Sequence, residues 1–301
     1  MLHTRLRLVS GALVVVAVAM SALSAVAAGD GELRVMSFNV RFARAGHSEA
    51  DTKNNWNDAE HPRRERAIRA IHEANPDLLG VQEARQEQIK DLQEALPEYM
   101  FTGVGRDDGQ QGGEFCGIFY RKSRFAEKEA GTFWLSETPD KPGTTFSPNK
   151  LPRIASWVKL GDKQTGREFV YLNMHWDHED VPAREKAASL VRERLATIAK
   201  DLPAIVTGDL NSFEDTKAFA TLVGADGPGR PLADSYRELH PERVKEEASF
   251  NNWRGTQKGS RIDFILHTAE FAATAADIVR TNYEGLWPSD HYPMTATLQL
   301  K

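Results

Sequence analysis

Short apolar runs that alternate with helix-period segments constrain the fold of this chain more than any other feature of its sequence. Apolar residues recur at helical spacing over 61–75, 86–96 and 183–200. Between and after these segments lie strand-length runs at 33–39, 77–83, 115–120, 154–160, 168–174, 204–207, 261–266 and 294–300. Several runs are apolar on both faces, so we expect helices or a second sheet to cover them. The pattern predicts a layered α/β domain.

The chain shows no sign of a division into two domains. No stretch rich in proline, glycine and serine interrupts it, and no internal repeat is visible. We therefore expect one domain, from about residue 30 to residue 301. With 41% hydrophobic and 27% charged residues, the composition is that of an ordinary globular protein. A single cysteine, Cys116, excludes an intrachain disulfide and a cysteine-built zinc site.

The first 28 residues predict an export signal rather than a part of the fold. Arg5 and Arg7 precede an apolar run over 11–28 that ends in the small residues Ser24-Ala25-Val26-Ala27-Ala28. This order is typical of a secretory signal peptide over 1–28. An uncleaved membrane anchor is the alternative, because the run is just long enough to span a bilayer. Cleavage changes the formal net charge from −5 to −7 and predicts a periplasmic or secreted protein without stable membrane anchoring.

Polar side chains follow many of the apolar runs directly. They are Asn39, Glu83, His175, Asp209, Asn211, Asp263, Asp290 and His291. Polar groups at the ends of buried strands cost desolvation energy unless something compensates them. If these strand ends converge, a divalent cation would bind the oxygens and neutralise the carboxylates. Oxygen donors without cysteine favour Mg²⁺ or Mn²⁺, with Ca²⁺ as a further possibility.

Each of these residues also has a purely structural interpretation. Glu83 would cap the helix that begins near residue 86, because acidic side chains favour helix N-termini. The residues around Asp209 are turn formers, and Asp290 with His291 would suit a surface loop beside Pro288. Asp263 would serve as a buried hydrogen-bond acceptor. The joint occurrence of the motifs, in this order, favours a catalytic site over these separate explanations.

The motifs that carry this order are Phe-Asn-Val (38–40), Val-Gln-Glu (81–83), Gly-Asp-Leu-Asn (208–211), Arg-Ile-Asp-Phe (261–264) and Ser-Asp-His (289–291). Together they resemble the endonuclease/exonuclease/phosphatase superfamily, the deoxyribonuclease-I-like hydrolases, over essentially all of 33–300. The segments 105–109 and 131–139 resemble a bacterial, often exported subgroup of metal-dependent hydrolases. The resemblance implies an α/β fold, a four-layered α/β/β/α sandwich with its active site at one edge of the paired sheets.

The resemblance also implies a metal site and a catalytic apparatus. Glu83 matches the main Mg²⁺ ligand, with Asn39 and Asp290 beside it. Asp209 and Asn211 match the pair that holds the attacking water, the phosphate or a second metal.

The remaining matched positions belong to proton transfer and phosphate binding. Asp263 matches the carboxylate that orients the catalytic histidine, His291. His175 matches a position that binds a non-bridging phosphate oxygen. These roles predict hydrolysis of a phosphodiester or phosphomonoester by metal-assisted attack of a water that the His-Asp pair activates.

Other functions remain as alternatives. One is a secreted nuclease acting on DNA or RNA, which the acidic net charge disfavours, because nucleic-acid binding depends on basic residues. A phospholipid head-group hydrolase is another, and a non-enzymatic binding module is the least favoured. A clustered basic face would favour the nuclease, and its candidates are Arg121, Lys122, Arg254, Lys258 and Arg261. No feature indicates an obligate protein partner.

Substrate-binding residues are predicted outside the motifs. Arg121 ends a strand and is a candidate phosphate contact, unless it is an ordinary surface arginine. Arg106 lies in the glycine-rich segment 102–114, which is either a substrate lip or a flexible surface loop. Trp176 follows His175 and offers a stacking surface, unless it belongs to the core.

Overall fold

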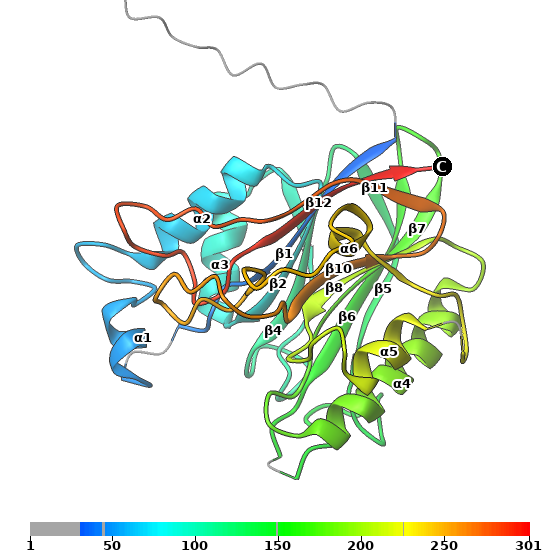
Figure 1. Ribbon diagram of the computed structural model, residues 1–301, viewed down its shortest axis with the longest axis horizontal. Coiled ribbons are helices and arrows are strands. Elements are labelled where there is room, and N and C mark those ends of the chain that lie inside the picture. Colours follow the sequence, from blue (N-terminus) through cyan, green and yellow to red (C-terminus); the bar gives the residue numbers. More distant parts are fainter. Residues whose placement is uncertain (1–30, 44–45, 149, 225) are drawn as a thin grey trace, which may run out of the picture.

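Two mixed β-sheets form the centre of the computed structural model, which describes residues 31–43, 46–148, 150–224 and 226–301 (Figure 1). The first sheet has the order β11-β12-β1-β2-β4-β3 and the second β5-β6-β7-β8-β10-β9. The first comprises β1 (Glu32–Asn39), β2 (Leu78–Ala84), β3 (Tyr99–Thr102), β4 (Phe115–Arg121), β11 (Phe271–Ile278) and β12 (Met294–Leu300). The second comprises β5 (Phe125–Trp134), β6 (Ile154–Asp162), β7 (Glu168–His175), β8 (Ala204–Asp209), β9 (Ala233–Asp234) and β10 (Asp263–His267).

Helices cover the outer faces of both sheets. The first sheet packs against α2 (Arg63–Ala74) and α3 (Gln86–Ala95), and the second against α4 (Val181–Ala199) and α5 (Lys217–Val223) (Figure 1). Two short helices, α1 (Glu49–Lys53) and α6 (Ser235–Leu239), lie in connections. The expected four-layered α/β/β/α sandwich is therefore confirmed.

The side-chain alternation of β1 shows why its sequence is apolar almost throughout. Leu33 and Val35 join the core between the two sheets, whereas Met36 and Phe38 join the core under α2 and α3. Both faces of the strand are buried, so both sets of alternating positions must be apolar. Burial of each such side chain contributes roughly 1.5–3 kcal/mol to the free energy of unfolding.

Two parallel strand pairs bring the polar strand ends to one edge of the sandwich. β1 is parallel to β2, and β7 is parallel to β8. Asn39 and Glu83 therefore lie at the same end of the first sheet, and His175 and Asp209 at the same end of the second. Asp263 lies opposite Asp209 in the antiparallel pair of β10 and β8.

A buried polar network joins the two sheets directly beneath this edge. Asn173 Nδ2 donates to the carbonyl oxygen of Val81 at 2.9 Å, while Gln82 Nε2 and Thr207 Oγ1 donate to Asn173 Oδ1 at 2.7 and 3.1 Å. A Cβ atom on Gly80 would lie 2.5 Å from Thr207 Oγ1. The close approach of the sheets at this point therefore requires glycine.

The helices and strands that the sequence predicts are all present, with ends that shift by a few residues. The sequence pattern missed β3, β5, β9, β11, α1, α5 and α6, which are short or carry many exposed residues. The predicted signal peptide over 1–28 lies outside the described residues. Among the residues that the structure does describe, no helix has the length and apolar character needed to cross a membrane.

Candidate active site

A pocket of about 640 Å³ opens at the edge where the polar strand ends meet. It is lined by side chains from both sheets and from the loops that follow them. They include Arg41, Phe42, His47, Glu83, Arg85, Arg106, Glu114, Arg153, His175, His178, Asp209, Asn211, Phe250, Trp253, Asp290 and His291. The pocket therefore collects nearly all the residues that the motifs single out.

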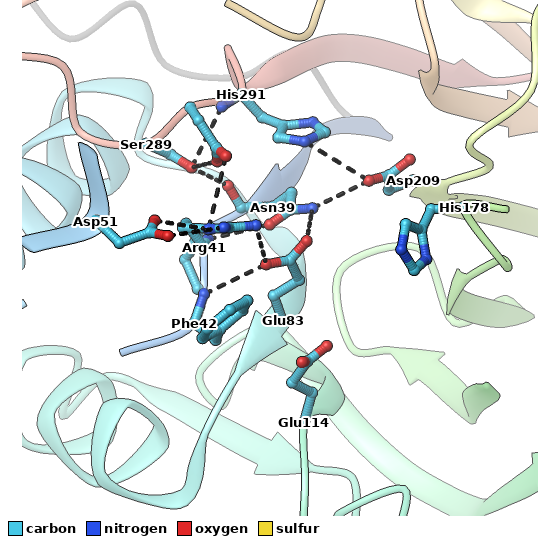
Figure 2. Close-up of polar contacts among 12 residues, drawn as sticks. Asn39, Arg41, Phe42, Asp51, Glu83, Glu114, His178, Asp209, Ser289 and His291 are labelled. Atoms are coloured by element: carbon cyan, nitrogen blue, oxygen red, sulfur yellow. Dashed lines mark hydrogen bonds and ion pairs between the residues drawn. The ribbon is translucent and has the colours of Figure 1, made fainter. Parts of the chain in front are cut away.

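Asn39 joins the carboxylates of the two sheets. Its Nδ2 donates to Glu83 Oε1 and to Asp209 Oδ2, both at 3.0 Å (Figure 2). Ligand atoms of Glu83, Asp209 and His291 all lie within 4.8 Å of one another. The structure thus brings together donors that come from β1, β2, β8 and the segment before β12.

The backbone at Glu83 turns its carboxylate into this cluster. Glu83 has φ of 62°, in the left-handed region that a glutamate rarely adopts. The register of β2 against β4 shifts between Val81 and Ala84, so Glu83 lies in the irregular part of the strand. Its carboxylate also accepts a long hydrogen bond from the backbone N–H of Phe42 at 3.4 Å.

Arg41 places a fixed positive charge beside the carboxylates. Its guanidinium makes two 3.0 Å hydrogen bonds to Asp51 and lies 3.5 Å from Glu83 Oε2 and 3.6 Å from Asp290 Oδ2 (Figure 2). Burial disfavours its charge, but these three carboxylates outweigh that effect and raise the pKa of Arg41.

Two of the three carboxylates in the cluster, Asp209 and Asp290, are held in surroundings that disfavour their charged forms. Burial, reinforced by Asp263, raises the pKa of Asp209 to about 7. Burial also raises the pKa of Asp290, whereas Arg41 and His291 outweigh burial at Glu83 and lower its pKa. Oxygen donors whose ionised forms are destabilised by burial and by one another fit a divalent cation, which would favour those forms.

His291 and Asp263 form a close pair next to this cluster. His291 Nδ1 lies 2.9 Å from Asp263 Oδ2, and its Nε2 lies 3.8 Å from Asp209 Oδ2. Burial alone would lower the pKa of His291, but Asp263 and Asp209 outweigh it and raise the pKa to about 10. The ring of Phe250 contacts the imidazole edge-on, with 5.0 Å between ring centroids.

His175 and Asn211 occupy the side of the pocket that the second sheet provides. Asn211 Nδ2 lies 3.0 Å from His175 Nε2, and the Asn211 backbone N–H donates to Asp209 Oδ1 at 2.9 Å. Burial, followed by the charges of Arg153 and Arg106, lowers the pKa of His175 well below its ordinary value. His175 is therefore a neutral imidazole at neutral pH.

Two predicted substrate contacts are wrong. Arg121 ends β4 beside Asp77, with 3.6 Å between Nε and Oδ1, and Asp77 precedes β2 at the end of that strand opposite Glu83. It therefore lies away from the pocket. Trp176 is fully buried in the core under α4, with its indole N–H directed at Met174 Sδ, so it offers no stacking surface.

Arg106 does line the pocket, in a segment that the structure shows to be well connected. Its guanidinium makes a bidentate pair with Glu114, at 2.7 and 3.1 Å. Backbone hydrogen bonds close the glycine-rich segment on itself, from Arg106 N to Glu114 O and from Asp107 N to Gly112 O, both at 3.0 Å.

Several pocket residues escaped the sequence analysis, chiefly Arg41, Glu114, Arg153 and Trp253. Arg153 directly precedes the buried run 154–160, and Glu114 directly precedes 115–120. A search of both ends of each strand, rather than of the carboxyl ends, would have found these two. Trp253 lies in a loop and gave no such signal.

Comparison with known proteins agrees with this geometry. The family model described as "Endonuclease/Exonuclease/phosphatase family" matches residues 36–291. Two solved structures from Bacteroides thetaiotaomicron are similar: a protein of this family (34% identity, 90% of this chain and 98% of that chain, TM-score 0.78) and a mannosyl-6-phosphatase (35%, 88% and 99%, TM-score 0.77).

Curated relatives are more distant and longer. Nocturnin of Drosophila melanogaster is 22% identical over 77% of this chain and 41% of its own length. An uncharacterized protein of Acanthamoeba polyphaga mimivirus, R895, is 30% identical over 38% of this chain and 20% of its own length. The chain thus spans less than half the length of these two relatives. Since the family model matches most of the chain, the protein belongs to the Endonuclease/Exonuclease/phosphatase family.

Proposed function

We propose that this protein is an exported, divalent-metal-dependent phosphoesterase that hydrolyses a small phosphate ester. The observation that carries the proposal is the convergence of Glu83, Asp209 and the His291–Asp263 pair in one pocket. The similar structure named a mannosyl-6-phosphatase supports a phosphatase and makes hexose 6-phosphates the first natural esters to test.

The metal site would use the oxygen donors of both sheets. Glu83, Asp290 and Asp209 would hold the cation, with the Asn39 amide beside them. Mg²⁺ or Mn²⁺ suits these hard ligands, with Ca²⁺ as an alternative. When bound, the cation supplies positive charge that polarises the phosphoryl oxygens.

His291 moves the proton of the attacking water. The 2.9 Å contact with Asp263 fixes the ring through Nδ1, so Nε2 faces Asp209 and the pocket. With a pKa of about 10, His291 is protonated when the nearby carboxylates are charged and unoccupied. Neutralisation of the Asp209 carboxylate removes one cause of that high pKa and makes Nε2 a better proton acceptor.

His175 and Asn211 stabilise charge on the phosphoryl oxygens. His175 is a neutral imidazole, so it would donate a hydrogen bond to a phosphoryl oxygen without itself carrying a positive charge. Asn211 is held by His175 and by the carbonyl oxygen of Trp176 at 3.1 Å. The two side chains thus form one connected polar pair on the second-sheet side of the pocket.

The nuclease alternative loses support from the distribution of basic residues. Arg261 is fully buried and pairs with Glu214 and Asp234, and Arg121 lies away from the pocket. The clustered basic face that would favour nucleic-acid binding therefore lacks two of its candidates.

A turnover panel tests the proposal. The purified protein is assayed with Mg²⁺, Mn²⁺ or EDTA on 4-nitrophenyl phosphate, bis(4-nitrophenyl) phosphate, hexose 6-phosphates, DNA, RNA and sphingomyelin. We expect EDTA-sensitive hydrolysis of a small ester that disappears in His291→Ala. Hydrolysis confined to nucleic acid or sphingomyelin would overturn the small-ester proposal, and absence of all turnover would favour a binding role. Fractionation of cells that express the full chain tests export.

A further inference from the structure

Arg153 is a buried cation that lines the pocket. It lies directly before β6, and its carbonyl oxygen accepts a 2.8 Å hydrogen bond from the backbone N–H of Leu135, which follows β5. Only 5% of the residue is exposed. Its backbone is thus fixed by the second sheet while its side chain reaches the pocket wall.

The close contacts of its guanidinium are with two imidazole rings. Nη1 lies 2.9 Å from both ring nitrogens of His175, and Nη2 lies 2.9 Å from His178 Nδ1. Nε has no hydrogen-bond partner among the described residues. Within the described part of the chain, no carboxylate lies within 4.0 Å of the guanidinium, although Glu114, Glu83 and Asp177 act on it from farther away.

Two of the other arginines of the pocket differ in this respect. Arg41 pairs with Asp51, and Arg106 pairs with Glu114. Arg85 also makes no ion pair among the described residues, but it is partly exposed to water. Among the arginines that line the pocket, Arg153 is therefore the buried guanidinium whose positive charge lacks a close counter-ion in the described residues. A buried charge without a partner is costly, so a charge kept in this position points to an anionic ligand.

The position of Arg153 fits the phosphoryl group of a substrate. His175 Nε2 lies 2.9 Å from Arg153 Nη1 and 3.5 Å from Asp209 Oδ2. The His175 ring thus lies between the guanidinium and the carboxylate cluster at which the ester would be hydrolysed. A planar guanidinium can bind two oxygens of one phosphate at once.

We propose that Arg153 determines specificity for phosphate monoesters by pairing with the two terminal oxygens of a doubly charged phosphoryl group. The inference rests on the proposed phosphoesterase function and names the substrate class of that same site. A diester has one negative charge, and a second ester group replaces one terminal oxygen. It therefore gains less from Arg153 than a monoester does.

Arg153→Met and Arg153→Lys test the inference, with Arg121→Met as the matched control because Arg121 lies away from the pocket. The measured quantity is kcat/KM for 4-nitrophenyl phosphate relative to bis(4-nitrophenyl) phosphate. We expect Arg153→Met to lower the monoester value by about 10- to 100-fold and the diester value by a much smaller factor, since a hydrogen bond to a charged group carries this energy. Arg153→Lys should lie between, because lysine keeps the charge and loses the bidentate geometry.

Binding of inorganic phosphate gives a second readout that does not need turnover. Calorimetric titration in Mg²⁺ should show at least about a 10-fold weaker affinity in Arg153→Met and an unchanged affinity in Arg121→Met. If Arg153→Met does not fold, Arg153→Lys decides in both experiments.

The outcomes separate this inference from the proposed function. Equal losses for monoester and diester would mean that Arg153 only orients His175, and the inference would be wrong. Unchanged phosphate affinity would overturn it as well. No metal-dependent turnover by the wild-type protein would overturn the phosphoesterase function, while the phosphate titration would still decide whether Arg153 binds the anion.

Discussion

Backbone strain gathers at the candidate active site. Among the non-glycine residues with left-handed φ, Arg41, Glu83, Asn211, Asn252 and Trp253 all line the pocket. Such conformations cost about 1–3 kcal/mol each and persist where the surrounding structure enforces them. Asn252 is held by its backbone N–H, which donates to the carbonyl oxygen of Asp290 at 3.1 Å. The strain therefore fixes the directions of the side chains that face the substrate.

The first prediction concerns the two residues with the most direct chemical roles. His291→Ala and Glu83→Ala should lower kcat by at least about 10²–10⁴, because one removes the proton-transfer group and the other a metal-binding carboxylate. Both variants should still fold, since large cores on either side of each sheet remain. Steady-state kinetics with circular dichroism as the folding check measures this. Near wild-type turnover of either variant with normal metal dependence would show that the roles are wrongly assigned.

A second prediction follows from the raised pKa of His291. A group whose pKa rises from 6.5 to about 10 on folding stabilises the fold fully below about pH 6.5, and this contribution disappears as the pH passes 10. Asp263→Asn removes the partner that holds the proton at 2.9 Å. Its melting temperature without metal should lie well below wild type near neutral pH, and the gap should narrow toward about pH 10.

Differential scanning calorimetry in EDTA at several pH values measures the gap. A difference that stays constant with pH would mean that Asp263 stabilises the fold by packing rather than through the charge of His291.

At the residue scale, the sequence predicted most of the acidic side chains of the candidate site and two of its histidines, but of the arginines that line the pocket it predicted only Arg106. The sequence analysis predicted Glu83, Asp209, Asp263 and His291, because polar groups at the ends of buried strands cost desolvation energy unless something compensates them. It did not predict Arg153, because a single arginine before a strand is an ordinary surface pattern in a sequence. Only burial shows that it is unusual.

At the scale of elements, α2 anchors the loops that carry the site. Arg63 at its start is fully buried; Nε donates to the carbonyl oxygen of Asn54 at 2.8 Å, and Nη2 to that of Arg41 at 2.9 Å. Nη1 donates to the carbonyl oxygen of Val40, in the segment that follows Asn39. Burial lowers the pKa of Arg63 to about 10, so the side chain keeps its charge at neutral pH.

The third prediction is that Arg63→Met weakens both the fold and the metal site. Loss of three hydrogen bonds to buried carbonyl groups should cost about 3 kcal/mol, or about 5 °C in Tm for a chain of this size. The loop after Asn39 should loosen, so the Mg²⁺ affinity measured by calorimetry should fall. Arg69→Met, on the exposed face of the same helix, is the control. A lower Tm with unchanged Mg²⁺ affinity would show that Arg63 stabilises the fold alone.

The elements themselves were predicted according to how strongly they are buried. β1, β2 and β8 are buried almost throughout, and their apolar runs are clear. β5 lies at a sheet edge and exposes Glu127, Lys128 and Glu129 in part or in full, so its sequence lacks an apolar run. Edge strands of this kind are held by their neighbour more than by their own pattern.

At the scale of the whole molecule, the site is a junction between the two sheets. Asn39 and Glu83 come from the first sheet and Asp209 from the second, and they are joined by the Asn39 side chain. A cation held by carboxylates from both sheets would link the two halves of the sandwich.

The fourth prediction is that Mg²⁺ or Mn²⁺ stabilises the protein against unfolding, more strongly at about pH 8 than at about pH 5.5. Binding at one hundred times Kd adds about 2.7 kcal/mol. The pKa of Asp209 is raised from 3.8 to about 7, so the metal-free fold loses stability as the pH rises between these values. The cation should restore that loss at high pH and compete with the proton at low pH. Melting curves with and without EDTA at both pH values measure this, and equal stabilisation at both would exclude Asp209 as a ligand.

Gly80 limits which substitutions the packing between the two sheets tolerates. Even a methyl group there would meet Thr207 and Asn173, so a larger residue would push the two sheets apart at this point. The geometry of the catalytic edge is therefore determined one layer below the pocket, in residues that never touch a substrate. Tolerance to substitution should accordingly be lowest at Gly80, Gln82, Asn173 and Thr207 and higher at rim residues such as Phe250. Substitutions at the rim can then change the substrate preference, while the buried residues between the sheets hold the candidate catalytic side chains in place.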